Sequence, residues 1–259
     1  MIANAVAAAT VLLLRDGPNH VETLLMRRHT ATRAFPGAYV FPGGVVDRSD
    51  RELPPTCWRT SRPLQWWRDE LKVPSEAAAL GFLVAAIRET FEEAGVLLAS
   101  HHDGRPVSRE DLASQVWVGA RKQLTSRDVK LDWAEWLVSE DLILDLDALQ
   151  FWSWWVTPVS SPYRFDTRFF AARFPAGQVA EHDQQEITQL RWLSPRSALE
   201  RFGRQTLPLR EPTVRNLEVL DGFRSSREAL RAASLGELDR RRKGPPPCGP
   251  ETADPHRGT

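Results

Sequence analysis

The stretch IRETFEEAG, residues 87–95, gathers three glutamates and an arginine directly before a glycine. On a helix, side chains three and four positions apart lie on one face, so Glu89, Glu92 and Glu93 would share one volume. Like charges this close repel one another, although Arg88 can pair with Glu92 at the i, i+4 spacing. Two explanations are open from this stretch alone: a solvated acidic helix face, or a site where a hard cation such as Mg²⁺ or Mn²⁺ offsets the repulsion.

The residues around the stretch predict a helix and, upstream of it, a glycine turn. Apolar residues keep a helical period from residue 79 to 94, Ser75 suits the N-cap position, and Gly95 suits the C-terminal end. FPGGVVD, residues 41–47, follows a predicted short strand over 38–41 that stops at a proline and two glycines. Because Gly43 and Gly44 have no Cβ, the backbone there can approach a phosphate or offer a carbonyl to a metal.

Together the two segments resemble the signature of Nudix hydrolases, which runs from a glycine through a glutamate to R-E-U-x-E-E-x-G-U, where U is apolar. The second half matches over residues 88–96. Counting back from Arg88, the signature's glutamate falls on Leu80 and its glycine on Pro74, whereas the paired glycines lie about thirty residues earlier. We infer that an insertion splits the signature, and Asp47 is a candidate for the missing acid.

The resemblance implies an α+β fold, an α/β/α sandwich around a mixed sheet, and roles for the matching residues. Glu92 and Glu93 would be the main ligands of Mg²⁺ or Mn²⁺, Glu89 would add a ligand or act as general base, and the carbonyl of Gly43 would bind the metal. Arg88 would orient a glutamate. A guanidinium beside three carboxylates is also expected to keep them ionised at neutral pH.

Two further residues are candidates for catalysis and for phosphate binding. Glu186, in EHDQQEITQLRW, precedes a predicted strand where many Nudix enzymes carry a late loop glutamate, and it is the other candidate base; a solvated loop charge is the alternative. Gly44, where the backbone can approach a phosphate, is a candidate substrate-binding residue. Histidines 29 and 182 are expected to be surface residues.

The segment LLMRRHTATRAFPGAYVFPGG, residues 24–44, is similar to the additional signature of coenzyme A diphosphatases. Arg33, Gly37 and residues 41–44 fit its second part, which makes Arg33 a candidate for binding substrate phosphate. The insertion, AIRETFEEAGVLL and the later RFDTRFF also resemble the eukaryotic peroxisomal branch of these enzymes, over about residues 5–220. The implied substrate is coenzyme A or an acyl-CoA, cut at its pyrophosphate.

Two alternatives to this function stay open, and so does the role of Arg168. ADP-ribose or another nucleoside diphosphate derivative would fit the same signature, because it selects the diphosphate group. A Nudix-fold ligand sensor without turnover is the alternative from another class, although the intact glutamates argue against it. In RFDTRFF, strand alternation puts Asp166 and Arg168 on one side, so Arg168 could reach a substrate phosphate or form a buried ion pair with Asp166.

The rest of the chain predicts strands mixed with helices, without regular alternation. Strands are expected over 6–14, 22–28, 151–158, 164–174 and 187–193, and helices over 108–124, 131–144, 195–202 and 213–220. We expect a Nudix domain over residues 1–224, with 48–74 as an inserted surface segment holding one helical turn at 64–71. A C-terminal helix over 225–242 and a disordered tail over 243–259 would follow.

Composition narrows the class of partner. Acidic and basic residues balance at 34 each, so no global basic field argues for nucleic acid, and a small nucleotide-type molecule is the expected substrate. The longest apolar stretch, residues 5–14, is too short to span a bilayer. The two cysteines give no reason to invoke disulfides. We therefore expect a cytoplasmic protein without a membrane partner. Five of the ten tryptophans fall in residues 133–155, where they favour core or a homodimer interface over an adenine or acyl pocket.

Overall fold

The computed structural model describes residues 5–32, 35–126, 131–161, 163–182 and 186–238. Within these residues a mixed sheet of seven strands forms the centre, in the order β10-β2-β1-β9-β8, with β3 beside β2 and β4 beside β1. Strand β1 pairs in parallel with β9, and the other pairings are antiparallel. The strands are β1 Val6–Asp16, β2 Val21–Arg28, β3 Tyr39–Val40, β4 Gly43–Val45, β8 Gln150–Val156, β9 Phe165–Arg173 and β10 Ile187–Leu193.

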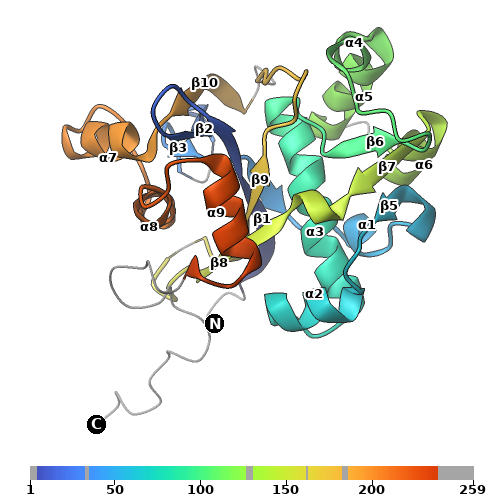
Figure 1. Ribbon diagram of the computed structural model, residues 1–259, viewed down its shortest axis with the longest axis horizontal. Coiled ribbons are helices and arrows are strands. Elements are labelled where there is room, and N and C mark those ends of the chain that lie inside the picture. Colours follow the sequence, from blue (N-terminus) through green and yellow to red (C-terminus); the bar gives the residue numbers. More distant parts are fainter. Residues whose placement is uncertain (1–4, 33–34, 127–130, 162, 183–185, 239–259) are drawn as a thin grey trace.

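A smaller sheet and the helices surround this centre (Figure 1). In the described residues the small sheet has the order β5-β7-β6, from β5 Trp58–Arg59, β6 Ala99–His101 and β7 Leu142–Asp145. The helices are α1 Arg48–Arg51, α2 Leu64–Leu71, α3 Glu76–Ala94, α4 Arg109–Ala113, α5 Gln115–Thr125, α6 Trp133–Ser139, α7 Pro195–Gly203, α8 Glu211–Leu220 and α9 Ser226–Ser234.

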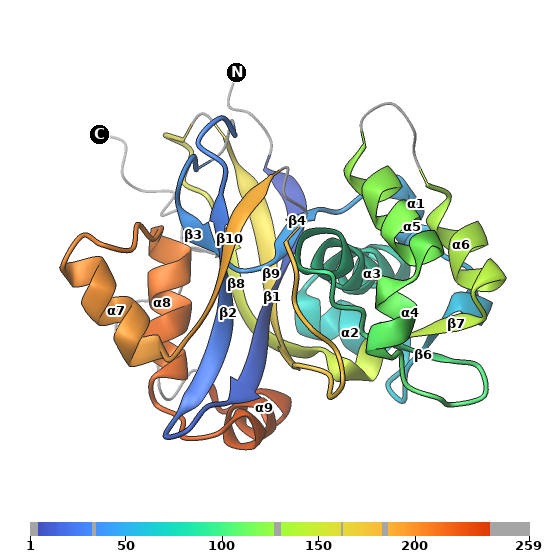
Figure 2. The same ribbon diagram turned by 90° about the horizontal axis from the view of Figure 1, so that it is seen from above.

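The central sheet lies between two helical layers, which confirms the predicted sandwich (Figure 2). Strand β1 is apolar on both faces, and its side chains alternate between two cores. Val11 and Leu13 belong to the core that contains α3, whereas Leu12 and Leu14 belong to the core that α7, α8 and α9 cover. The alternation therefore fixes α3, with its glutamates, against one face of β1.

Helix α3 begins and ends where the sequence predicts. The Ser75 hydroxyl accepts a hydrogen bond from the backbone N–H of Ala78 at 3.1 Å, and Gly95 ends the helix with φ of +66°. Arg121 of α5 then donates to the last carbonyls, those of Glu92 at 2.8 Å and Glu93 at 2.9 Å. This cap, which the sequence did not reveal, fixes the carboxylate-bearing end of the helix.

Residues 48–74 correct the expectation of a purely surface segment. Helix α2 lies over residues 64–71 as predicted, but the segment also forms α1, a 3₁₀ turn at Pro55–Cys57 and strand β5. Cys57 and Trp67 are fully buried and pack in the α3 core. The charged and proline-rich sequence conceals this packing, because its few apolar residues have no periodic spacing.

Several other boundaries differ from the predicted ones. The helix expected over 108–124 is divided at Ser114, which caps α5 through the backbone N–H of Trp117. In the stretch expected as a helix over 131–144, α6 is followed by strand β7. Gly43 and Gly44, expected to end a strand, themselves form β4 against β1.

Helix α9 packs on the sheet through Ala229, Ala232 and Ala233, which lie in the core of Trp152 and Phe223. It ends at Ser234, shorter than the predicted 225–242, and Gly236 with φ of +66° follows. The tail expected to be disordered lies outside the described residues.

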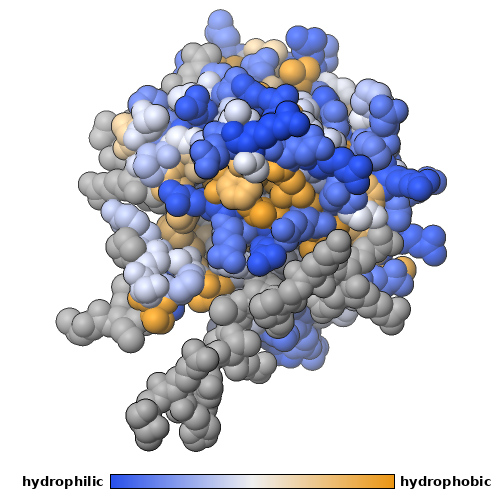
Figure 3. Space-filling view, turned by 90° about the vertical axis from the view of Figure 1, so that its left-hand side faces the viewer, coloured by the Kyte–Doolittle hydropathy of each residue, from blue (hydrophilic) through white to orange (hydrophobic). Residues whose placement is uncertain are grey.

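No described helix combines the length and the hydropathy needed to cross a bilayer. Seen from the side of α7 and α8, the surface is largely hydrophilic, with a hydrophobic area near the middle and smaller ones elsewhere (Figure 3). Phe202 of α7, 40% exposed, is one of the exposed apolar residues of the described chain. A homodimer stays a prediction.

Candidate active site

Arg88 lies at the centre of the carboxylates and is only 6% exposed. Its guanidinium donates to Glu89 at 2.9 Å and to Glu92 at 3.3 Å. Two further bonds of 2.9 Å go to the two oxygens of Asp50 in α1, and one of 3.0 Å goes to the carbonyl of Val45 in β4. Burial favours a lower pKa for Arg88, but the hydrogen bond to Asp50 and the charges of the surrounding carboxylates raise it above its usual value.

Asp50, rather than Asp47 or residue 80, supplies the acid that pairs with Arg88. Leu80 lies inside α3, eight residues before Arg88, and eight residues of helix span about 12 Å, too far for a direct pair. The carboxylate of Asp47 is 3.9 Å from Arg88 and 55% exposed, whereas that of Asp50 is 1% exposed. Counting back from Arg88 missed Asp50 because the insertion separates the two halves of the signature; counted forward from Gly44, the same spacing of six residues places the acid at Asp50.

The paired glycines bring β4 against the glutamates of α3. The Gly43 N–H donates to a carboxylate oxygen of Glu93 at 2.9 Å, and a Cβ at Gly43 would overlap the backbone of β1. A Cβ at Gly44 would stand 2.5 Å from a carboxylate oxygen of Glu89. Only glycine permits this approach. The hydrogen bond from Gly43 to Glu93 uses the Gly43 amide, so metal binding by its carbonyl stays a prediction, as does phosphate binding at Gly44.

The electrostatics of Glu89 and Glu93 correct one expectation. Burial raises the pKa of Glu89, and the charge and hydrogen bond of Arg88 only partly oppose it. Burial and then the charge of Glu89 raise the pKa of Glu93 well above its usual value, against the lowering effects of the Gly43 amide and Arg28. Arg88 therefore opposes the effect of burial on Glu89 without offsetting it, so it stabilises the charged form less than the sequence suggests.

The donor set fits a hard divalent cation. Glu89, Glu92 and Glu93 offer oxygen ligands, and a bound cation would offset both the burial and the mutual repulsion of two of them. As they stand, these carboxylates hydrogen-bond to Arg88 and Gly43. No group of three acidic, histidine or cysteine side chains in the described chain is already arranged around a common metal position.

Arg28, at the end of β2, connects this cluster to the late loop. One guanidinium nitrogen lies 3.9 Å from Glu93, and another lies 3.4 Å from Glu186, whose side chain is 52% exposed. The Nε of Arg28 is buried and has no hydrogen-bond partner among the described residues. The structure thus brings Glu186 to the glutamates of α3 through an arginine that the sequence did not single out, although it lies within LLMRRH.

Arg168 is occupied by structural contacts. It is 2% exposed, pairs with Asp166, donates to the carbonyl of Leu71 at 2.8 Å and lies 4.0 Å from the ring centre of Trp154. These contacts agree with the buried ion pair that strand alternation allowed. Substrate binding by Arg168 stays a prediction without support in this geometry, and Arg33 lies outside the described residues.

The tryptophans are mainly core residues. Trp133, Trp136 and Trp152 are buried, and Trp136 stacks on Phe91 of α3 with ring centres 5.4 Å apart. None of the tryptophans in residues 133–155 lines the cavity between α3 and α5 or the one at the end of β1; Trp117 of α5 lines the first of these instead.

A mixed sheet between helices, with a glutamate-rich helix held behind a glycine strand, defines a protein of the Nudix fold class. A family model of the NUDT19 Nudix domain matches residues 61–220, which include α3; β4 and Asp50 precede that range. The chain belongs to the Nudix hydrolase family, in the branch of this domain.

Relatives and a solved structure agree with this assignment. The chain is 32% identical to "Acyl-coenzyme A diphosphatase NUDT19" of Gallus gallus, over 86% of this chain and 67% of that protein. It is 30% identical to the Homo sapiens protein of the same name, over 78% and 61%. A crystal structure of a NUDIX hydrolase from Alicyclobacillus acidocaldarius is 27% identical, with a TM-score of 0.69 over 91% of this chain and all of that one. The chain thus spans roughly three fifths to two thirds of the length of these two relatives.

Proposed function

We propose that the protein is a divalent-metal-dependent diphosphatase that cleaves coenzyme A or an acyl-CoA at the pyrophosphate. The observation that carries the proposal is the carboxylate cluster of α3, held by Arg88, facing β4 and reached by Glu186 through Arg28. The names of the NUDT19 relatives and the segment 24–44 support the choice of substrate.

Glu89, Glu92 and Glu93 are the residues that would hold Mg²⁺ or Mn²⁺. When bound, the ion supplies positive charge that offsets the charge of the diphosphate and lowers the pKa of a coordinated water. Arg88 keeps Glu89 and Glu92 in place, because its other donors are fixed by the buried Asp50. Arg28 adds a cation whose Nε has no hydrogen-bond partner among the described residues, and a guanidinium suits a diphosphate oxygen.

The reaction is an in-line displacement at phosphorus. A water oxygen forms a bond to one phosphorus while the bond from that phosphorus to the bridging oxygen breaks. The products are adenosine 3′,5′-bisphosphate and an (acyl) phosphopantetheine. Glu186 is the better candidate to take the proton of the water, because its carboxylate is half exposed, whereas that of Glu89 is 13% exposed and bound to Arg88.

A substrate panel tests the proposal. The purified chain is incubated with Mg²⁺ or Mn²⁺ and with CoA, acyl-CoAs, dephospho-CoA, ADP-ribose, NADH and dinucleoside polyphosphates, and the phosphate-containing products are identified by mass spectrometry. We expect adenosine 3′,5′-bisphosphate from CoA or acyl-CoA, and none in the presence of a chelator. Cleavage of ADP-ribose alone would contradict the CoA assignment, and binding without any cleavage would favour a ligand sensor.

Water enriched in ¹⁸O identifies the attacked phosphorus. The label should appear in only one of the two products, because a single P–O bond is formed with water. The Glu186→Gln variant should lower kcat by roughly 10²-fold or more, as removal of a general base does. An unchanged kcat would indicate that Glu89 is the general base instead.

A further inference from the structure

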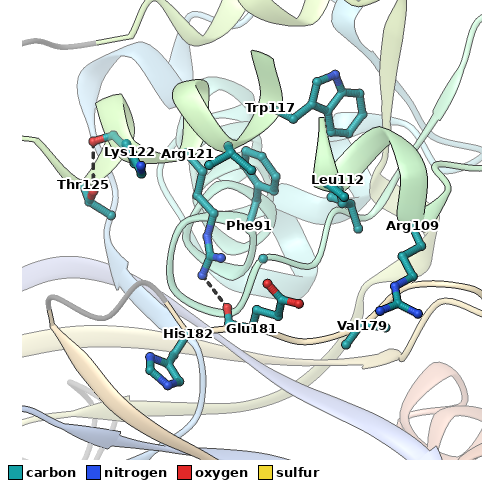
Figure 4. A pocket seen from close by; sticks show the side chains of 13 residues that line it. Phe91, Arg109, Leu112, Trp117, Arg121, Lys122, Thr125, Val179, Glu181 and His182 are labelled. Carbon is teal, nitrogen blue, oxygen red and sulfur yellow. Dashed lines mark hydrogen bonds between the residues drawn. The ribbon is translucent and has the colours of Figure 1, made fainter. Parts of the chain in front are cut away.

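A cavity of about 500 Å³ lies between α5, the end of α3 and residues 179–182. Figure 4 shows Phe91 and Arg121 beside its centre, Arg109 and Lys122 on opposite sides, and Glu181 pointing into it. Its volume is within the range of small-molecule sites. None of the roles in the proposed reaction uses this space.

The cavity lies at the C-terminal end of α3, the helix that carries the glutamates of the candidate active site. Its wall includes Phe91, directly before Glu92, and Gly95, two residues after Glu93. The backbone N–H of Glu181 donates to the carbonyl of Ala94 at 2.9 Å, so the segment lining the cavity is attached to the same end of the helix. Glu186 follows this segment in the sequence. A substrate held with its diphosphate at the glutamates could therefore extend one end into the cavity.

The lining combines apolar side chains with cationic ones. Phe91, Leu112 and Trp117 supply the apolar surface, and Glu181 is the one carboxylate of the lining. Arg109 and Lys122 form no ion pair with any described residue. Arg121 is different, because its guanidinium is bound to the carbonyls at the end of α3 and to that of Glu181.

We propose that this cavity binds the phosphorylated adenosine half of the substrate, with its phosphomonoester attracted by the positive charges of Arg109 and Lys122, which stand on opposite sides of the cavity. This assignment rests on the proposed function, and it names the half of the molecule that the cavity recognises. An aromatic and aliphatic surface suits the purine ring, and unpaired cations suit a phosphate. Glu181 is an acceptor for a ribose hydroxyl.

The charges favour this half over the acyl chain. An acyl chain is stabilised by apolar surface alone. It would gain nothing from the positive charges of Arg109 and Lys122. A phosphomonoester carries roughly −1.5 to −2 charge at neutral pH, which makes it the group that gains most from them. The cavity would consequently distinguish CoA from dephospho-CoA, which lacks this group.

The decisive variant is Arg109→Gln/Lys122→Gln, assayed with CoA and with dephospho-CoA. The wild type should show kcat/KM at least tenfold higher for CoA, since a charged hydrogen bond contributes about one such factor. In the double variant the ratio should fall to about one, with kcat/KM for dephospho-CoA within about threefold of the wild type. The matched control, Arg201→Gln/Arg204→Gln, removes the same charge from an exposed part of α7 and should keep the ratio.

Binding without turnover separates this proposal from the proposed function. Isothermal titration calorimetry with adenosine 3′,5′-bisphosphate and with AMP should show tighter binding of the bisphosphate, and the double variant should lose that difference. A protein that cleaves CoA but binds both nucleotides equally would overturn the cavity assignment alone. A protein that cleaves no diphosphate would contradict the proposed function, while the binding difference would still decide the cavity.

Kinetics with acyl-CoAs of different chain length test the alternative that the cavity binds the acyl or pantetheine end of the substrate. If the double variant changes the chain-length dependence and leaves the ratio of CoA to dephospho-CoA intact, the cavity holds the acyl or pantetheine end, and the assignment to adenosine is wrong.

Discussion

Asp50 and Arg88 form a two-bonded buried ion pair, with both N–O distances at 2.9 Å, at the inner side of the carboxylate cluster. The pair joins α1, directly after the glycine strand, to α3 across 38 positions of sequence. It leaves the third guanidinium nitrogen of Arg88 for Glu89 and Glu92. Asp50 thus acts as a positioning residue for the glutamates.

We expect Asp50→Asn to destabilise the protein by about 2 kcal/mol, because a buried cation loses its main counter-charge. The metal concentration that gives half-maximal activity should rise roughly 10-fold to 100-fold, as for other residues that orient metal ligands. Urea unfolding and Mg²⁺ titration of activity measure the two effects. Asp47→Asn, whose carboxylate is exposed and more distant, is the control; an equal effect there would remove the distinction between the two aspartates.

Glu93→Gln should lower kcat by at least roughly 10²-fold, as loss of a preorganised electrostatic contact does, without unfolding the protein. In the absence of metal, stability should not fall, because the substitution removes a buried charge that Glu89 repels. Thermal unfolding with and without Mg²⁺ should show a stabilisation in the wild type that the variant lacks. Near-normal turnover would mean that Glu93 is not a metal ligand.

Arg28→Ala should reduce kcat/KM by roughly 10-fold to 100-fold, because a buried charged donor between Glu93 and Glu186 is lost. Arg28→Lys should restore only part of the activity, since lysine keeps the charge but not the guanidinium geometry. Arg27→Ala, on the exposed neighbouring residue of β2, serves as the matched control. Equal losses in the two alanine variants would point to general charge rather than to this bridge.

Gly44→Ala should impair activity strongly, because the new Cβ would stand 2.5 Å from the Glu89 carboxylate. The displaced glutamate should also cost about 1–3 kcal/mol of stability, as overpacking commonly does. Gly203→Ala, where an added Cβ meets nothing within 4 Å, should be neutral or slightly stabilising. Steady-state kinetics and urea unfolding of both variants measure these effects. Full activity of Gly44→Ala would show that β4 can move away from Glu89 without loss of function.

Asp16 joins α9 to the sheet, since its carboxylate accepts a hydrogen bond from the backbone N–H of Ser226 at 2.7 Å. That bond lowers the pKa of Asp16 below its ordinary value of 3.8, with a smaller contribution from Arg173. The stabilisation is therefore present above that value and is lost as pH falls through the lower folded-state pKa. Asp16→Asn should weaken α9 at pH 7 and flatten the acid dependence of unfolding below about pH 4.

Hydrogen exchange of the α9 amides locates that effect. Protection of Ala229 and its neighbours should decrease in Asp16→Asn, while α3 stays unchanged, because the two helices lie on opposite faces of β1. Uniform loss of protection would indicate global destabilisation instead.

Local sequence patterns predicted the central part of the fold. Helix α3, its cap at Ser75 and its end at Gly95 followed from period and capping chemistry, and β1, β2, β8, β9 and β10 followed from apolar, aromatic and β-branched runs. These signals are short in range, so a linear sequence carries them fully. Residues 48–74 were misjudged, since the burial of Cys57 and Trp67 depends on what packs over them.

The sequence by itself determined the helix, the face that carries Glu89, Glu92 and Glu93, and the glycines that let β4 approach them. Only the tertiary structure decided that Asp50 pairs with Arg88, that Arg28 links Glu93 to Glu186, and that Arg121 caps α3 beside a cavity. The reason is physical: helical spacing is a property of consecutive residues, whereas an ion pair between distant segments depends on how strands and helices pack.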